Sequence, residues 1–236
     1  MFRIIYLGSY LVLNLLYLLP FLSKAKRLRD QGRAEEMYDF IFNTAYRVGG
    51  GLVKRSGSTV HVSGTEKLPD GPVLFVSNHQ SNFDIPLMMG CINKPKSYIA
   101  KIELSTLPLV STWMKIGKCV FIDRDDARQS LKAINEGIGI LKKGHSMVIF
   151  PEGTRSKGPQ TLEFKKGSLR LATKSGVPIV PVTISGSYKM MEANNGKIKP
   201  AEVHITIADP IYTDHLTKKE ENQLNDRVYE IIKSNL

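Results

Sequence analysis

The stretch VLFVSNHQSNFDIPLMM, residues 73–89, changes character halfway along and indicates how the chain folds. It starts with apolar residues suited to a buried strand and ends in a helix-forming run, with Pro86 in the expected first turn. The same order, a short apolar run and then a helical stretch, recurs through most of the remaining chain. This alternation predicts an α/β fold with a mixed, largely parallel sheet flanked by helices.

The expected strands of this sheet are short runs rich in valine and isoleucine. They lie at 58–62, 73–77, 97–100, 119–122, 146–150, 179–184 and 203–207. Helices are expected at 84–92, 105–116, 126–142, 166–175 and 218–234. In parallel sheets, functional side chains gather in the loops beyond the carboxyl ends of strands. The loops after 73–77 and 146–150 are therefore the first places to look for a site.

The amino-terminal part of the chain has a different composition. Residues 4–22 are almost wholly apolar and uncharged, close to the roughly 20 residues that a membrane-crossing helix needs. Residues 35–54 are amphipathic, with Met37, Ile41 and Val48 near one helical face. We expect the two helices to form a membrane-attachment hairpin in a single leaflet. A spanning helix and a pair of soluble helices are the alternatives.

A basic cluster lies between these two segments, and a glycine run lies within the second. The cluster is Lys24, Lys26, Arg27, Arg29 and Arg33, which by the positive-inside rule places the following chain on the cytoplasmic side. The glycine run at 49–51 marks the change to the strand–helix pattern. These features predict a membrane-associated region at 1–55 and a separate α/β domain at 56–236.

The charge balance narrows the class of partner. Lys and Arg number 33 against 22 Asp and Glu, a formal net charge of +11. This excess favours an anionic partner, which is a nucleic acid, an anionic membrane surface or a phosphorylated substrate. Cys91 and Cys119 sit far apart in apolar sequence, so we expect reduced cysteines in a cytosol-facing domain.

The loop after 73–77 carries a histidine and an aspartate five residues apart, His79 and Asp84. On a continuous helix these residues would lie about 140° apart, but in a turn that leads into a helix the carboxylate can fold back on the imidazole. A carboxylate bonded to one ring nitrogen fixes the tautomer and makes the other nitrogen a better base. The alternative is an aspartate that caps the helix beside a solvated histidine.

The loop after 146–150 reads FPEGTR, residues 150–155. Gly153 permits a positive φ or a close backbone approach, and Thr154 and Arg155 can donate to phosphate oxygens. Lys165, Lys166 and Arg170 follow, and Gly167–Ser168 are expected to open a helix whose free N–H groups also suit an anion. Arg124, at the end of the strand at 119–122, can clamp a phosphate or pair with a neighbouring aspartate. The alternative for the whole region is an ordinary basic surface turn.

Together these loops resemble the glycerolipid acyltransferase family, specifically its lysophosphatidate (1-acyl-sn-glycerol-3-phosphate) acyltransferases. The resemblance rests on four blocks in family order, N-H-x-S-x-x-D, F-I-x-R, F-P-E-G-T-R and a proline-containing apolar block. Their counterparts here are Asn78–Asp84, Phe121–Arg124, Phe150–Arg155 and Val177–Val182. The resemblance covers about 75–185, and the segments on either side carry no motif.

The resemblance implies that His79 is the general base and that Asp84 orients it. It also implies an acceptor phosphate site made of Arg124, Glu152, Gly153, Thr154 and Arg155. The implied reaction moves an acyl group from acyl-CoA or an acyl carrier protein to the sn-2 hydroxyl of lysophosphatidate. It yields phosphatidate, as in phospholipid biosynthesis, with no metal and no cofactor. Anionic membrane lipid is a further expected partner, and the protein is expected at the cell membrane with its catalytic domain on the cytoplasmic face.

Several other readings compete with this one. Glycerol-3-phosphate or another lysophospholipid is the alternative acceptor within the family. A serine hydrolase is disfavoured because the sequence has no G-x-S-x-G elbow. A nucleic-acid-binding module is disfavoured because no P-loop, zinc-ligand spacing or aromatic RNA-binding signature occurs.

Lys101 and Lys118 are additional basic candidates near the site. Structural roles are expected for the remaining histidines, His61, His145, His204 and His215.

Overall fold

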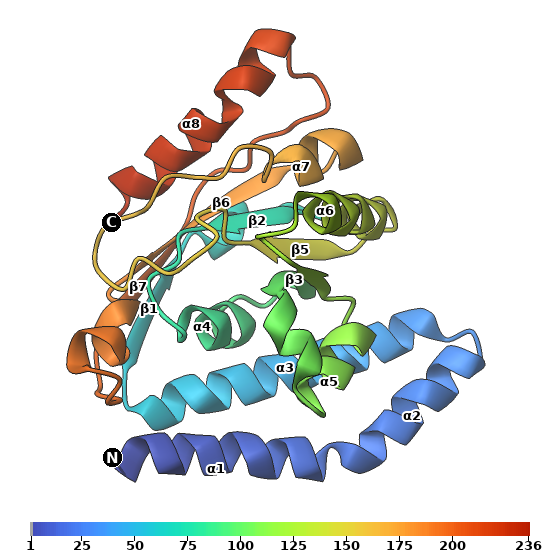
Figure 1. Ribbon diagram of the computed structural model, residues 1–236, viewed down its shortest axis with the longest axis vertical. Helices are drawn as coiled ribbons and strands as arrows, with labels where there is room; N and C mark the ends of the chain where they lie inside the picture. The colour runs from blue at the N-terminus through green and yellow to red at the C-terminus, as the bar shows by residue number, and fades with distance from the viewer. Residues whose placement is uncertain (1) are drawn as a thin grey trace.

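The computed structural model describes residues 2–236 and contains a seven-stranded sheet with helices on both faces (Figure 1). The strands are β1 (Thr59–Ser63), β2 (Leu74–Ser77), β3 (Lys96–Lys101), β4 (Val120–Ile122), β5 (Ser146–Ile149), β6 (Ile179–Ser185) and β7 (Glu202–Ile207). Their order across the sheet is β1-β7-β6-β2-β5-β3-β4, and only the β6–β7 pair is antiparallel. The predicted mixed, largely parallel α/β fold is confirmed.

Helices cover the sheet in two layers (Figure 1). One layer contains α6 (Ala127–Lys142), α7 (Arg170–Ser175) and α8 (Lys218–Ser234). The other contains α1 (Phe2–Tyr17), α2 (Leu19–Asp30), α3 (Ala34–Ser56), α4 (Asp84–Cys91) and α5 (Val110–Ile116). Short 3₁₀ helices occupy Thr65–Lys67, Ile102–Thr106, Ser187–Met190 and Glu192–Asn194.

Successive residues of the central strands supply two separate hydrophobic cores. Leu74 and Val76 of β2 pack into the core beneath α6, α7 and α8, while Phe75 packs with α3 and α4 on the opposite face. This follows from the alternation of side chains along a strand. A strand buried on both faces needs a nearly continuous apolar run, which is why β2 and β5 are so clear in the sequence.

Two predicted helices are shorter than expected, and local residues explain both differences. The segment 105–116 is a 3₁₀ turn followed by α5 from Val110, because Pro108 disfavours the helical region for Leu107, whose backbone is extended. The segment 166–175 is helical only from Arg170, since Gly167 has a φ of +88° that no right-handed helix contains. The predicted helix N-terminus at Gly167–Ser168 is therefore wrong.

The apolar run at 4–22 is divided between two helices rather than forming one. Pro20 lies in the first turn of α2, where it lacks the N–H that would continue the hydrogen-bond ladder of α1. Among residues 2–236 no single helix is long and apolar enough to cross a membrane. The pair Arg3–Tyr17 and Leu19–Asp30, bent by 46°, meets the length and composition criteria together. The predicted buried face of the next helix is present, with Met37, Ile41 and Val48 of α3 buried.

Candidate active site

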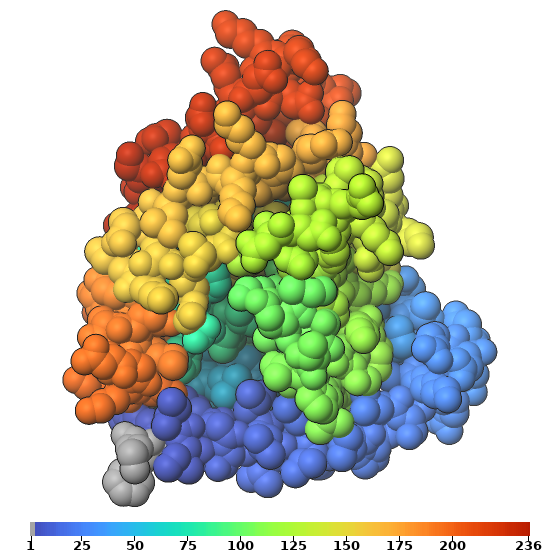
Figure 2. Space-filling view, in the orientation of Figure 1, coloured from blue at the N-terminus to red at the C-terminus, as the bar shows by residue number. Residues whose placement is uncertain are grey.

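Three chain segments meet at the carboxyl ends of neighbouring strands in the middle of the sheet. They are the turn after β2 (78–83), the turn after β5 (150–156) and the segment after β6 (186–192). They converge because β6, β2 and β5 are adjacent and parallel, so all three strands end at one edge. Figure 2 shows a hollow on this face, with teal atoms of the β2–α4 stretch at its base, above the blue helix α1.

The His79 and Asp84 side chains are joined by a hydrogen bond of 2.7 Å between Nδ1 and Oδ2. The Asp84 side chain is fully buried, while 14% of the His79 side chain is exposed. Residues 78–83 form a turn and Asp84 is the first residue of α4, which lets the carboxylate fold back on the ring. Helix α4 has no side-chain cap hydrogen bond, so the alternative of a capping aspartate is wrong.

Two further donors hold the Asp84 carboxylate. The Ser81 N–H donates to Oδ2 at 2.8 Å, and the Ser187 hydroxyl donates to Oδ1 at 2.5 Å. Ser187 is fully buried and begins the 3₁₀ helix after β6. Each Asp84 oxygen therefore has a fixed partner, which restricts the carboxylate to the orientation that meets the imidazole.

The His79 turn is fixed to the neighbouring turn through its backbone and its ring. The His79 N–H donates to Glu152 Oε1 at 2.6 Å, and the His79 carbonyl accepts from the Ser156 N–H at 2.8 Å. The imidazole stacks on the Phe150 ring with centroids 4.2 Å apart. Within residues 2–236, Nε2 has no hydrogen-bond partner, so this nitrogen is available to a ligand.

Glu152 lies at the contact between these two turns. Only 4% of the residue is exposed, and its second oxygen accepts from the Leu162 N–H at 3.0 Å. Burial raises the pKa of the Glu152 carboxyl to about 7, and the nearby charge of Asp84 adds to the effect against the two N–H donors. Both oxygens are engaged and a carboxylate repels a phosphate. We therefore interpret Glu152 as the residue that positions the His79 turn.

Arg155 binds a carboxylate that the sequence did not single out, that of Glu192. Its guanidinium is 3.0 Å from Glu192 Oε1, which also accepts from the Asn82 N–H at 3.0 Å. Glu192 Oε2 accepts from the Ser81 hydroxyl at 2.5 Å. Glu192 thus links Arg155 to the turn that carries His79, and 31% of the Arg155 side chain remains exposed.

The remaining phosphate candidates lie on the same turn or beside it. Arg124 donates to the Gly153 carbonyl, and Gly153 has a φ of +70°, as the glycine at this position predicted. A Cβ at Gly153 would lie 2.6 Å from the Lys165 side chain. Thr154 is exposed and its hydroxyl makes no hydrogen bond within residues 2–236. Arg124 and Lys165 therefore both lie against Gly153.

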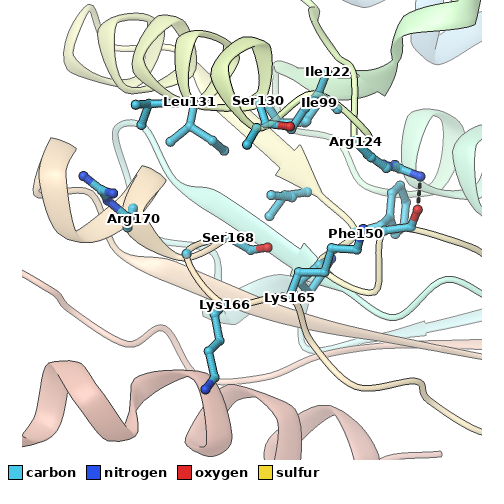
Figure 3. Close-up of a pocket in the computed structure, with 16 residues that line it drawn as sticks. Ile99, Ile122, Arg124, Ser130, Leu131, Phe150, Lys165, Lys166, Ser168 and Arg170 are labelled. Atoms are coloured by element: carbon cyan, nitrogen blue, oxygen red, sulfur yellow. Dashed lines mark hydrogen bonds between the residues drawn. The ribbon is translucent and has the colours of Figure 1, made fainter.

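A cavity of about 370 Å³ opens beside Gly153 (Figure 3). One wall carries Ile99, Ile122, Ser130 and Leu131, and the other carries Phe150, Lys165 and Ser168. Arg124 lies at one end and Arg170 at the other. Because Phe150 lines the cavity and also stacks on His79, the cavity adjoins the turn that carries His79. Its walls are largely apolar and its edge is cationic.

The other lysine candidates have different surroundings. Lys101 pairs with Glu103 and is exposed. Lys118 contacts His145 before β4 and β5 begin, at the amino ends of these parallel strands and therefore away from the site. The prediction that Lys118 lies near the site is wrong. Ser187 and Glu192 were missed although both follow the predicted strand at 179–184, and the rule about carboxyl ends of strands applies to them as well.

A family model and several known proteins are similar to this chain in sequence. A family model described as acyltransferase matches residues 59–185, a range that includes all four sequence blocks. A chloroplastic 1-acyl-sn-glycerol-3-phosphate acyltransferase of Brassica napus is 36% identical over 154 residues, 64% of this chain and 44% of the relative. A probable 1-acyl-sn-glycerol-3-phosphate acyltransferase of Mycoplasma pneumoniae is 33% identical over 212 residues, 85% of this chain and 77% of the relative.

A solved structure is similar across nearly the whole chain. It is the crystal structure of the 1-acyl-sn-glycerophosphate (LPA) acyltransferase PlsC from Thermotoga maritima. The TM-score is 0.85 at 30% sequence identity, and the match covers 99% of this chain and 93% of that one. The chain nevertheless spans less than half the length of the plant relative.

Proposed function

The chain belongs to the acyltransferase family, and from that premise we propose that it transfers an acyl group from a thioester donor to the sn-2 hydroxyl of lysophosphatidate. The product is phosphatidate. The observation that carries the proposal is the 2.7 Å contact between the buried Asp84 carboxylate and His79 Nδ1, which leaves Nε2 available to a substrate hydroxyl. The names of the relatives support lysophosphatidate as the acceptor.

In the proposed mechanism His79 Nε2 accepts the proton of the sn-2 hydroxyl as its oxygen attacks the thioester carbonyl. The Nδ1–H donates to Asp84, whose negative charge stabilises the imidazolium that forms. The tetrahedral intermediate then collapses, its C–S bond breaks, and the proton passes to the departing thiolate of coenzyme A or of an acyl carrier protein. The acyl group passes directly from the thioester to the hydroxyl oxygen, and no covalent acyl-enzyme intermediate forms.

The acceptor phosphate is assigned to the cations around the turn after β5. Arg155 uses one terminal nitrogen for Glu192, and its other guanidinium donors remain for a phosphate. Thr154 and Arg124 lie on the same turn or against it. The cavity of Figure 3, with apolar walls and a cationic edge, is suited to an acyl chain next to a phosphate.

An acyl-transfer assay tests the proposal. The purified full chain is given acyl-CoA together with lysophosphatidate, glycerol-3-phosphate or lysophosphatidylcholine in separate reactions. We expect phosphatidate from lysophosphatidate at the highest kcat/KM. Faster turnover of either other acceptor would replace the proposed substrate, and thioester hydrolysis without acceptor acylation would contradict the reaction.

Replacing Arg155 by alanine is expected to raise the KM for lysophosphatidate about tenfold or more, with a smaller effect on kcat. A charge-assisted hydrogen bond to phosphate contributes roughly 1.5–3 kcal/mol, and the lost binding is felt before the chemical step. Steady-state kinetics with varied acceptor measures this change. Arg227→Ala, an exposed arginine on α8, is the matched control. An unchanged KM for Arg155→Ala would remove the residue from the phosphate site.

Replacing Ser187 by alanine is expected to lower kcat by about tenfold or more while KM stays within twofold. The change removes the donor to Asp84 Oδ1 and leaves a fully buried carboxylate oxygen unpartnered. A role confined to stability would instead lower the melting temperature and spare kcat in the folded fraction. Ser175→Ala, whose hydroxyl bonds only to the backbone of its own helix, is the control.

We also propose that the protein is attached to the cytoplasmic face of the cell membrane through α1 and α2. Exposed apolar side chains on α1, including Leu13 at 64%, and the basic residues on α2 support this attachment to anionic lipid. A flotation assay with vesicles containing phosphatidylglycerol measures it. Leu13→Glu is expected to reduce the bound fraction, whereas Tyr212→Glu, equally exposed after β7, is not. Equal loss in both variants would argue against attachment through α1.

A further inference from the structure

Two histidines lie opposite each other on the edge strand β1 and on its neighbour β7, away from the turns that carry His79 and Glu152. His61 of β1 and His204 of β7 are direct partners in the parallel register, and Glu202 precedes His204 by two residues. Neighbouring residues Val60, Val62, Val203 and Ile205 pack into the core on the α3–α4 side. Alternation along the strands therefore sends the two histidines and Glu202 to the opposite face. The backbone register fixes this arrangement.

The three side chains converge at their polar ends. His61 Nε2 is 3.3 Å and His204 Nε2 is 3.6 Å from Glu202 Oε1, and the three atoms all lie within 4.8 Å of one another. The two imidazole rings stack with centroids 4.9 Å apart. Ligand atoms at about 2.0–2.1 Å from a tetrahedral zinc ion are roughly 3.3–3.4 Å from each other. The observed spacing is thus close to that of a zinc ligand set.

Exposure of the three residues permits the remaining adjustment. Their side chains are 52% (His61), 68% (Glu202) and 57% (His204) exposed, so small rotations about their side-chain torsions can bring the two imidazole nitrogens closer. A fourth coordination position stays open to solvent.

We propose that His61, Glu202 and His204 bind a divalent transition-metal ion of the zinc class. Two imidazoles and one carboxylate form a donor set that suits Zn²⁺, Ni²⁺ or Cu²⁺, whereas Mg²⁺ and Ca²⁺ require oxygen ligands. The bound ion joins β1 to β7. Strand β1 lies at the edge of the sheet and pairs only with β7, so this link stabilises the part of the sheet that follows α3.

Titration of the untagged, metal-free protein with Zn²⁺ tests the proposal. Isothermal calorimetry is expected to give one equivalent bound, and Zn²⁺ at a hundredfold excess over Kd is expected to raise the melting temperature by about 5–10 °C. Mg²⁺ and Ca²⁺ at the same concentrations should produce neither effect. Acyl transfer is measured in parallel, and its failure would bear on the catalytic proposal alone.

Strand variants identify the ligands. His61→Thr and His204→Thr should each abolish the zinc-dependent rise while leaving the metal-free melting temperature unchanged, since both positions are exposed and threonine suits a strand. Glu202→Gln, which keeps both imidazoles, should weaken binding at least tenfold. His215→Thr, a 92% exposed histidine outside the cluster, should bind zinc normally. Absence of binding, or binding that survives both histidine substitutions, would overturn the proposal.

Discussion

Replacing His79 by alanine is expected to lower kcat for acyl transfer by about a thousandfold. General-base catalysis by a positioned side chain contributes roughly 10²–10⁴-fold, and within residues 2–236 His79 is the imidazole that the buried Asp84 orients. The remaining rate would come from substrate binding and from stabilisation of the oxyanion. Phosphatidate formation under saturating acceptor and donor measures the change.

Two controls separate this chemical loss from a loss of structure. His215→Ala removes an exposed histidine and should retain full activity. Asp84→Asn should lose activity on a similar scale to His79→Ala, because an amide neither fixes the same tautomer nor carries the charge that stabilises imidazolium. The melting temperature of His79→Ala should stay close to that of the parent, since the turn is also held by Glu152 and Ser156 through its backbone. Near-normal turnover of folded His79→Ala would exclude the base role.

The central pair of the site was predictable because its geometry is local. Only four residues lie between His79 and Asp84, and the strand before them and the helix after them are both evident in the sequence. Ser187 and Glu192 contact this turn from more than 100 residues away. Their place depends on β6 lying beside β2, and strand–helix alternation does not specify the order of strands in a sheet. Burial of Glu152 likewise depends on the two turns meeting.

The fold was predictable where periodicity and composition act over a whole element. All the predicted strand positions correspond to strands. The central strands β2 and β5 are buried on both faces and require apolar runs, whereas β1 and β7 alternate between more buried and more exposed residues. Errors occurred where one residue changes the local backbone, as Pro108 and Gly167 do. Helix propensity summed over a window misses such positions, because one residue with a non-helical backbone ends a helix whatever its neighbours favour.

The glycine run at 49–51 had a different role from the one expected. It lies inside α3, which continues to Ser56, and does not interrupt the helix. Gly49 and Gly50 face α4, where a Cβ on Gly49 would be 2.7 Å from the Met89 Cβ, whereas Gly51 faces the Tyr10 side chain of α1. The glycines therefore allow the backbones of α3 and α4 to touch. Sequence alone indicated a break because glycine is unfavourable within helices, and the compensating contact is visible only in three dimensions.

Replacing Gly90 by alanine is expected to destabilise the protein by about 3 kcal/mol, the upper part of the usual range for overpacking. A Cβ at Gly90 would lie 2.0 Å from the Gly50 nitrogen and 2.5 Å from its Cα, and these are backbone atoms that cannot rotate away. The helices α3 and α4 would have to separate. For a domain of this size the melting temperature should fall by about 6–12 °C, which thermal unfolding followed by circular dichroism measures.

The matched control for this effect is Gly139→Ala on α6. A Cβ there meets nothing within 4 Å, so the same substitution should stabilise the helix by about 0.5–1 kcal/mol. The two variants add the same methyl group to a helical glycine and differ only in what it meets. Opposite shifts of the melting temperature would therefore isolate the contact between α3 and α4 from helix propensity. Two equal shifts would mean that the backbones of these helices are not in contact, and that the amino-terminal helices pack on the sheet less closely than the crossing at Gly90 requires.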